Sequence, residues 1–566
     1  MQRWLRVLPL VLATGCVGEL DAIPEVYDEE TAATPCAGKC DAPGEMTGLP
    51  ALPSTTVATL FAPYEPALGL DLLLIRQVVE ARAADPAMYP EGANPFRIRY
   101  AAYNLDNPYL AQALADAEAA NVDVQILIES DQLDPAKDYN VQDDYLVDRG
   151  FELALDHAQL DDAGRTTADL VGIRGTGLMH LKTRLYTWKD AAGQSTSRLV
   201  TGSLNPGNLS MHNDETLHYI AIPEIIARYQ ATYDAVLRGV KITNTWTDGA
   251  AAQVLFSPDG GPQAIDKIAA LIDQEQESIL LATFSLRNMS PTTGGKGILN
   301  RLVAAHQRGV AVVVVTDRKQ SDGIDSDGNP LYANDSSEDI LRSAGIPVYE
   351  VMNKYSPYNA MHHKYAIFGV TRPIVVTDAG NWSKASLGSG TVRPINHESV
   401  LFVDSMQLDG GVTGKRYLGN FLDVIRKYGT RGADGQTPTG GPEPSSIVER
   451  LQALAGWPTV DVTFRARVET VPGEMVFVTG DHAALGDWTQ AGQGYALGTD
   501  ASTYPVWASA PLAVPFGTRL AYKLIKRGTG VIWETGDDRG LIVDSTDRRT
   551  VGGYPQPAIT TNLTWR

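Results

Sequence analysis

Two stretches of the sequence place a histidine two residues before a lysine, among apolar residues. The first, GLMHLKTRLY, contains His180 and Lys182, and the second, MHHKYAIF, contains His362 and Lys364. Alternate residues of a strand point to the same face, so each histidine and its lysine would face one pocket. An imidazole can act as a nucleophile or a proton donor, and a lysine ammonium group attracts an anion.

Each of these motifs is followed by the same kinds of polar residue in similar order. They are Ser203, Asn205 and Glu215 in the first half, within TGSLN and NDE, and Asn381, Ser383 and Glu398 in the second half, within TDAGNWS and NHE. The two histidines are 182 positions apart, the asparagines 176 and the glutamates 183. Such similar spacing indicates an internal duplication, with small differences in loop length.

Together these groups suit one phosphate held between two histidines. Lysine ammonium groups and asparagine amides can hold its oxygens, and each glutamate could accept the second ring N–H of a histidine and so fix its tautomer. A metal ion does not suit the set, because the lysines beside the ligands would repel it. We therefore expect no cofactor.

The elements around the motifs alternate between helical and strand patterns. Residues 122–130 and 309–317 are apolar runs typical of buried strands, and each follows a helical pattern, at 108–120 and 297–308. This order predicts an α/β fold with central strands. We expect two tandem α-β-α lobes, residues 56–248 and 249–430, that form one pseudo-two-fold unit.

The duplicated motifs resemble those of the phospholipase D superfamily, His-x-Lys-x4-Asp followed by Gly-Ser-x-Asn, over roughly residues 55–430. The resemblance implies a metal-independent phosphodiesterase that works through a covalent phosphohistidine. His180 would attack phosphorus and His362 would protonate the leaving alcohol, an assignment that rests only on the order in related enzymes. The groups that would hold the phosphoryl oxygens are Lys182, Lys364, Asn205 and Asn381.

The sequence departs from the family signature at four positions. The signature aspartate is Thr187 in the first copy and Gly369 in the second, and Asp378 and Ala379 replace the second Gly-Ser pair. The family's aspartate supports the fold, so we still expect catalysis.

The remaining histidines need no catalytic role. His363 should face away from its two neighbours, and His397, next to Glu398, could serve either purpose. Structural roles are expected for His157, His212, His218, His306 and His482. The stretch SDGIDSDGN at 321–329 fails the spacing of an EF-hand calcium loop, so we expect a polar turn.

The chain ends in a segment with short alternating strands and several tryptophans. Residues 431–457 have the composition of a linker and short helix, and 458–566 predict an antiparallel β-sandwich. This segment resembles the starch-binding family 20 carbohydrate-binding module. The resemblance implies one glucan site, formed by Trp488, Lys523, Trp533 and Asp538. Trp507 is expected in the core, and Pro472 stands where a second site would have an aromatic residue.

The N-terminus, MQRWLRVLPLVLATGC, has the pattern of an export signal over residues 1–16. Its end resembles a bacterial lipoprotein cleavage box, with Cys16 as the lipidation site, and secretion without lipid is the alternative. Residues 17–55 have the composition of a disordered tether. Cys36 and Cys40 either pair in an oxidising compartment or stay reduced.

The 566 residues carry a net charge of −20, which disfavours broad binding to nucleic acid or anionic membranes. We expect a monomeric, exported phospholipase D-type enzyme, secreted or lipid-anchored in the bacterial envelope, that binds starch or glycogen-type glucan. A nuclease or other phosphodiesterase, with nucleic acid only as substrate, is the second hypothesis. A catalytically inactive glucan-binding protein is the third.

Overall fold

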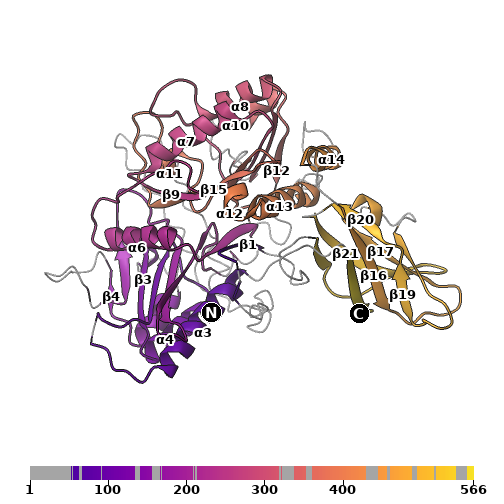
Figure 1. Ribbon diagram of the computed structural model, residues 1–566, viewed down its shortest axis with the longest axis horizontal. Helices are drawn as coiled ribbons and strands as arrows, with labels where there is room; N and C mark the ends of the chain where they lie inside the picture. The colour runs from indigo at the N-terminus through magenta and orange to yellow at the C-terminus, as the bar shows by residue number, and fades with distance from the viewer. Residues whose placement is uncertain are drawn as a thin grey trace, which may run out of the picture.

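The computed structural model describes most of the chain after residue 51 (Figure 1). The described residues are 52–53, 55–62, 67–90, 92–133, 141–155, 166, 168–207, 210, 213–317, 320, 337–351, 360–428, 444–455, 459–486, 488, 494–515, 518–543 and 558–566. The expectations for the export signal, nearly all of the tether, all three cysteines, His157, His212, the 321–329 stretch and most of the linker therefore lie outside the described residues.

The first lobe is built on an eight-stranded sheet with strand order β1-β8-β7-β6-β2-β3-β5-β4. Its strands are β1 (Val57–Ala62), β2 (Arg97–Ala102), β3 (Asp123–Glu129), β4 (Leu153–Ala154), β5 (Leu170–Ile173), β6 (Thr183–Lys189), β7 (Ser195–Gly202) and β8 (Glu215–Ile220). Its helices are α3 (Ala67–Ala84), α4 (Pro108–Ala119), α5 (Val141–Asp148) and α6 (Pro223–Leu237), with a 3-10 turn at Ser130–Leu133.

The second lobe is built on a seven-stranded sheet with strand order β12-β11-β10-β13-β14-β15-β9. Its strands are β9 (Ala252–Ser257), β10 (Ser278–Thr283), β11 (Ala311–Asp317), β12 (Val348–Val351), β13 (Lys364–Phe368), β14 (Ile374–Thr377) and β15 (Glu398–Asp404). Its helices are α7 (Gly261–Gln274), α8 (Ile298–Gln307), α10 (Ser337–Ser343), α11 (Lys384–Leu387), α12 (Ser405–Asp409) and α13 (Val412–Tyr428), and α14 (Pro444–Ala455) follows.

The two sheets share one topology over seven strands. In each, three neighbouring strands run parallel, β2-β3-β5 and β10-β11-β12, and the first sheet adds β4 parallel to β5; the other pairs are antiparallel. The predicted strands at 122–130 and 309–317 are β3 and β11, and the helices predicted before them are α4 and α8. The α/β class and the duplication are therefore confirmed, whereas the predicted domain limits remain predictions.

Local sequence explains where α4 begins. Asn107 lies at its N-cap in an extended conformation, and its side chain accepts hydrogen bonds from the N–H groups of Tyr109 and Leu110 at 3.1 Å. Pro108 follows at the first helical position, where its missing N–H costs nothing. The cap fixes the end of the segment 101–107, which leads from β2 towards the site.

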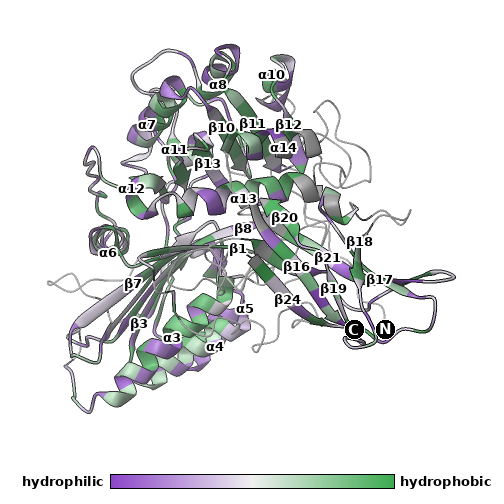
Figure 2. Cartoon of the chain, turned by 45° about the vertical axis from the view of Figure 1, so that its right-hand side comes forward, coloured by the Kyte–Doolittle hydropathy of each residue, from purple (hydrophilic) through white to green (hydrophobic). Residues whose placement is uncertain are grey.

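Each sheet is covered on both faces. The outer faces pack against α3 and α4 in the first lobe and against α7 and α8 in the second, and these helices carry mixed apolar and polar residues (Figure 2). The inner faces form one shared core with α6 and α13, which includes Phe61, Tyr229, Phe256, Tyr365 and Tyr417. Because this core contains side chains from both lobes, the lobes are joined by apolar packing, which stabilises their relative position.

The third sheet lies beside α13 and α14 at the C-terminal end of the chain (Figure 1). Its strands are β16 (Thr459–Arg467), β17 (Met475–Gly480), β18 (Tyr495–Gly498), β19 (Val506–Ser509), β20 (Leu512–Pro515), β21 (Thr518–Arg527), β22 (Val531–Trp533), β23 (Arg539–Val543) and β24 (Ala558–Thr564). The pairs are antiparallel, as predicted, except that β16 and β24 run parallel. In the described part of the chain, no helix combines the length and apolar composition that a bilayer crossing requires.

Candidate active site

The two His-x-Lys motifs lie at the start of corresponding strands, β6 and β13. His180 and Lys182 come just before β6, and Lys364 is the first residue of β13. Lys182 Nζ lies 3.0 Å from His180 Nε2 and donates to the His180 carbonyl at 3.2 Å. Lys364 Nζ donates to the carbonyl oxygen of His362 at 3.1 Å. All four side chains are buried. Each lysine therefore lies on the same side of the chain as its histidine, as the sequence predicts. The strands, however, begin after the histidines rather than including them.

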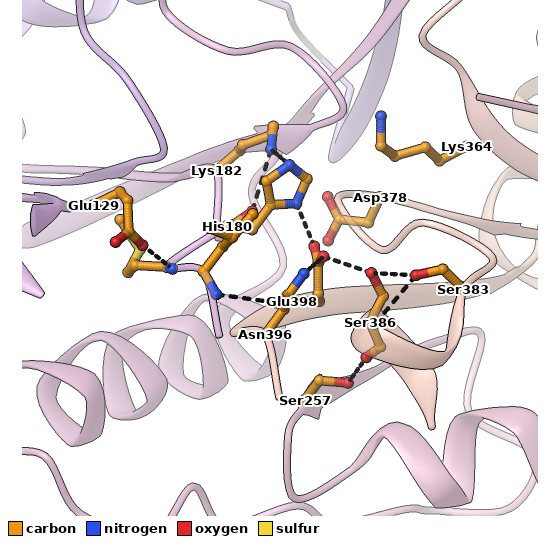
Figure 3. A network of polar contacts seen from close by, with 12 residues as sticks. Glu129, His180, Lys182, Ser257, Lys364, Asp378, Ser383, Ser386, Asn396 and Glu398 are labelled. Carbon is orange, nitrogen blue, oxygen red and sulfur yellow. Dashed lines mark hydrogen bonds and ion pairs between the residues drawn. The ribbon is translucent and has the colours of Figure 1, made fainter. Parts of the chain in front are cut away.

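Each histidine is held by the glutamate of the other lobe. His180 Nδ1 lies 2.8 Å from Glu398 Oε2, and His362 Nδ1 lies 2.8 Å from Glu215 Oε1. A carboxylate that accepts the Nδ1–H leaves Nε2 for chemistry. The predicted carboxylate partners are therefore present, and they are crossed between the lobes. Figure 3 shows the pair of His180 and Glu398.

The backbone makes the same crossed connection. Met179 forms a parallel bridge with His397, and Asp214 forms one with Met361. The N–H of His180 donates to the carbonyl of His397 at 3.1 Å, and the N–H of His362 to that of Asp214 at 3.0 Å. The sequence left open whether His397 has a catalytic or a structural role. Its backbone carbonyl positions His180.

A serine hydroxyl supports each glutamate, but from different places in the two lobes. Ser203 Oγ donates to Glu215 Oε2 at 2.5 Å. Ala379 occupies the matching position in the second lobe, and there Ser386 Oγ of α11 donates to Glu398 Oε1 at 2.7 Å. Ser383 caps α11 and lies 3.3 Å from Ser386 Oγ (Figure 3). The sequence did not reveal Ser386, because its replacement of the missing hydroxyl depends on the turn of α11.

Two further carboxyl groups position the residues before the histidines. Glu129, at the end of β3, accepts the N–H of Met179, and Asp317, at the end of β11, accepts the N–H of Met361 at 3.0 Å. Burial raises the pKa of Glu129. Both lie at the carboxyl ends of strands predicted from the sequence, where functional side chains of α/β sheets gather, and this was the signal that could have identified them.

Aromatic rings flank the two histidines. The ring centroid of Tyr103 lies 5.5 Å from that of His180, and Phe284 lies 4.7 Å from His362, both edge-on. These residues come from the corresponding segments 101–107 and 282–288. Lys364 Nζ also lies 5.1 Å from the centroid of Phe284. The rings make the surroundings of both imidazoles partly apolar, which strengthens nearby electrostatic interactions.

The predicted phosphoryl-binding asparagines occupy equivalent places. Asn205 follows β7 and is buried, and Asn381 follows β14 and is half-buried. Their contact with a phosphoryl group remains a prediction. Among the residues that the structure describes, no three His, Cys, Asp or Glu side chains are arranged as metal ligands.

Asp378 also belongs to this region. It is buried, has φ of +106°, and its carboxyl group accepts a hydrogen bond from Thr201 Oγ1 at 2.7 Å and another from the hydroxyl of Tyr229. A non-glycine residue in such a conformation costs on the order of 1–3 kcal/mol. Burial raises the pKa of Asp378, against the hydrogen bonds from Tyr229 and Thr201.

Other histidines have structural contacts. His363 Nδ1 lies 2.9 Å from Thr216 Oγ1, within the interface of the lobes. His218 lies 2.8 Å from the hydroxyl of Tyr417 and 3.2 Å from Thr59 Oγ1, and burial lowers the pKa of His218 to about 3. Both therefore join strands of the first lobe to the second, in agreement with the structural roles expected for them.

Two half-buried tryptophans of the third sheet lie close together. The ring centroids of Trp488 and Trp533 lie 6.5 Å apart with planes inclined by 30°. Lys523 Nζ lies 3.9 Å from Asp538 Oδ1 and donates to the carbonyl of Gly536 at 2.6 Å. The four predicted residues thus form two neighbouring pairs on β21, β22 and the loops beside them. Trp507 is buried and donates to the carbonyl of Val468, as expected for a core residue.

Models of two known families match two separate parts of the chain. The family model described as "Cardiolipin synthase, PLD-like domain" matches residues 268–410, in the second lobe. The model described as "Starch binding domain" matches residues 459–552. The chain contains a phospholipase D-like domain and a starch-binding domain.

Curated relatives match this chain over short segments. An alpha-amylase of Streptomyces violaceus is 37% identical over 86 residues, which are 15% of this chain and 14% of that protein. A lytic polysaccharide monooxygenase of Aspergillus terreus is 40% identical over 88 residues, or 15% of this chain and 22% of that protein. The chain therefore spans less than a quarter of the length of these relatives.

Solved structures of proteins named for related activities resemble parts of this chain at low identity. The phospholipase D family member Nuc of Salmonella typhimurium is 22% identical, with a TM-score of 0.23, over 31% of this chain and 95% of that one. A phosphatidylserine synthase of Haemophilus influenzae is 12% identical, with a TM-score of 0.41, over 71% and 93%.

The positions where this phospholipase D-like chain lacks the signature aspartate lie away from the histidines. Thr187, near the end of β6, lies 2.9 Å from Ser197 through their hydroxyl groups. Gly369, just after β13, has φ of +72° in a turn whose next N–H groups bond to Glu277. Both positions follow their histidine by seven residues, at the other end of the strand, so the replacements leave the crossed histidine–glutamate pairs intact.

Proposed function

We propose that the chain is an exported phosphodiesterase that cleaves phospholipid head groups through a covalent phosphohistidine and is attached to α-glucan by its starch-binding domain. The main support is the pair of buried histidines, each with Nδ1 bonded to a glutamate of the other lobe. In each pair Nδ1 faces the carboxylate, so Nε2 is the nitrogen that would meet a phosphoryl group, and a buried lysine lies beside each histidine.

The reaction would proceed in two displacements at phosphorus. The Nε2 lone pair of His180 attacks, the bond from phosphorus to the leaving oxygen breaks, and protonated His362 gives that oxygen its proton. Water then attacks the phosphohistidine while His362 takes its proton, and the bond between phosphorus and His180 breaks. General acid–base catalysis of this kind contributes about 10²- to 10⁴-fold.

His180 is assigned as the attacking residue from the order of the motifs in related enzymes, and Lys182 Nζ lies 3.0 Å from its Nε2. The attacking imidazole must be neutral, whereas the imidazole that donates the proton must be protonated. The lysines and asparagines would hold the non-bridging oxygens as charge develops.

Phospholipid is the favoured substrate for two reasons. The net charge of −20 disfavours a polyanionic strand, and the family model that matches the second lobe is described by a lipid-synthesising enzyme. A nuclease or other phosphodiesterase with the same chemistry is the second candidate. A catalytically inactive glucan-binding protein is the third, and the buried crossed pairs speak against it because ionisable groups are costly to bury without use.

Hydrolysis of bis-p-nitrophenyl phosphate in the presence of EDTA tests the chemistry. We expect turnover by the wild type, loss in His180→Ala and His362→Ala, and retention in His306→Ala, a matched histidine on α8. Activity that appears only when a metal is added would refute the mechanism. Phosphatidylcholine, phosphatidylethanolamine and single-stranded DNA, assayed with the same variants, separate lipid from nucleic acid.

Export is tested in cells rather than in the purified protein. We expect the chain in the envelope or medium, and Cys16→Ala should move it from a membrane-bound to a released fraction if Cys16 carries lipid. Full-length protein in the cytoplasm would contradict export.

A further inference from the structure

Arg184 is a wholly buried cation on the strand that follows the first His-x-Lys motif. It lies on β6, two residues after Lys182 and four after His180. Its guanidinium group keeps its proton throughout the working pH range of a protein. Burial of such a charge is costly unless its neighbours compensate for it, so the partners of Arg184 indicate its role.

One of these partners is the loop that carries Asn205. Nη2 of Arg184 donates a hydrogen bond of 2.5 Å to the carbonyl oxygen of Leu204. Leu204 lies between Ser203 and Asn205, one of the residues predicted to hold the phosphoryl group. Because a peptide bond is planar, a fixed Leu204 carbonyl also fixes the start of the backbone at Asn205.

The other contacts hold the side chain of Arg184 on the face of the sheet that packs against α3. Nη1 lies 3.5 Å from Asp71 Oδ2 of α3, and Cζ lies 5.6 Å from the ring centroid of Tyr100 on β2. The hydroxyl of Tyr186 donates to Asp71 Oδ1 at 2.6 Å. The guanidinium group is therefore confined between α3, β2 and the loop after β7.

The second lobe has an alanine at the matching position. Two residues after Lys364, the counterpart of Lys182, stands Ala366. It is buried in the apolar core of its lobe. The same topology is thus built there with a methyl group in place of the guanidinium group, so the fold alone does not account for the charge in the first lobe.

The asparagine loop of the second lobe is anchored in another way. Trp382, which follows Asn381, forms a bridge with Leu286, and helix α11 begins two residues later. In the first lobe, the N–H of Asn107 donates to the loop at 3.3 Å, and Arg184 ties the loop to β6. Each lobe thus fixes its asparagine loop, the first with a buried side chain and the second with a bridge and a short helix.

We propose that Arg184 is a positioning residue that acts through Asn205. Its bond to the Leu204 carbonyl ties the loop of Asn205 to the strand that follows His180. The Asn205 amide is thereby held where charge develops on the phosphoryl oxygens, and preorganised donors of this kind stabilise the transition state. The proposal rests on the proposed phosphodiesterase function.

Kinetics of Arg184→Met with bis-p-nitrophenyl phosphate test the proposal, because methionine keeps an unbranched apolar side chain and removes the donor. We expect kcat to fall about tenfold or more, as for a lost hydrogen bond from a charged group, with KM changed less than about threefold. Arg184→Lys, which can still donate to the loop, should recover part of kcat. In a protein that carries Asn205→Ala, Arg184→Met should lower kcat by less than about threefold, since residues that act through one another are not additive.

Arg99→Met is the matched control. It removes the ion pair between Arg99 of β2 and Asp123 of β3, which lies at the opposite ends of these strands from the site, so kcat per folded molecule should stay at the wild-type value. Hydrogen exchange of the peptide that contains residues 203–207 reports on the loop without substrate. We expect faster exchange in Arg184→Met and wild-type exchange in Arg99→Met.

The proposal is overturned if Arg184→Met keeps the wild-type kcat, or if it lowers kcat by the same factor with and without Asn205→Ala. Unchanged exchange in Arg184→Met would also contradict it. Absence of wild-type turnover would instead refute the proposed function, and hydrogen exchange would then decide whether Arg184 holds the loop.

Discussion

His180 Nδ1 lies 2.8 Å from Glu398 Oε2, although 218 positions separate the two residues in the chain. In the second pair, His362 Nδ1 of the second lobe lies 2.8 Å from Glu215 Oε1 of the first lobe. Neither lobe therefore contains a complete histidine–glutamate pair of its own. Both pairs exist only when the two halves of the duplication are packed together.

Removing the charge of one glutamate should impair its histidine in the other lobe. We expect Glu398→Gln to lower kcat by about 10²- to 10⁴-fold with little change in KM, because the amide can favour the wrong tautomer of His180. Steady-state kinetics measure this, with Glu152→Gln, at an exposed position, as the control. A variant of Glu398 with wild-type kcat would mean that the crossed pair has no part in turnover.

A serine at position 379 should be able to replace Ser386 as the hydroxyl donor to Glu398. Ser386→Ala removes a hydrogen bond to a carboxylate, an interaction that contributes about 1.5–3 kcal/mol, so kcat should fall about tenfold or more. Adding Ala379→Ser introduces the arrangement of the first lobe, where Ser203 supports Glu215. We expect the double variant to recover much of the activity. Equal activity of the single and double variants would show that the second position cannot supply the hydroxyl.

The stability of the fold should fall in acid through His218. Its pKa is lowered to about 3 in the folded protein, so below its unfolded value of 6.5 the unfolded chain binds the proton more readily. The contribution is present above pH 6.5 and is lost as pH falls towards 3, by up to about 1.4 kcal/mol per pH unit. Urea unfolding at several pH values measures it. His218→Gln should flatten this dependence and His306→Gln should not; an unchanged slope in His218→Gln would contradict the burial argument.

The glucan site should depend on its two aromatic rings. We expect Trp488→Ala with Trp533→Ala to weaken retention on insoluble starch more than about tenfold, because each lost ring removes stacking area. Tyr504→Ala, at an exposed aromatic residue between β18 and β19, should retain binding if there is one working site. Unchanged retention of the double variant would place the glucan site elsewhere.

The sequence indicated which residues form the candidate site, but not which residues they contact. The repeated order of histidine, lysine, asparagine and glutamate identified both halves, since a duplication leaves its mark in spacing. The crossing of the pairs could not be read from it, because spacing along the chain does not say which lobe a glutamate faces. Ser386 and Asp378 were missed as site residues for a related reason, because their contacts arise from a short helix and from the lobe interface.

The strands were predicted well where both faces of the sheet are covered. All seven residues of β11 are buried, which gives the continuous apolar run seen in the sequence. The strands of the histidine motifs were less exact. His180 and His362 precede β6 and β13 and are held by isolated bridges to the other lobe, and such contacts leave no periodic pattern.

A covalent phosphohistidine is the central claim, and trapping it is the most direct measurement. With bis-p-nitrophenyl phosphate the leaving nitrophenolate needs no proton. In the His362→Ala variant, His180 should therefore still attack the substrate, but the resulting adduct should be hydrolysed slowly. Denaturation without acid, digestion and mass spectrometry should then find the p-nitrophenyl phosphoryl group on the peptide that contains His180, and none in the variant that also carries His180→Ala. An adduct on another residue would contradict the account. So would rapid turnover by the wild type if no adduct can be trapped in the wild type or in His362→Ala.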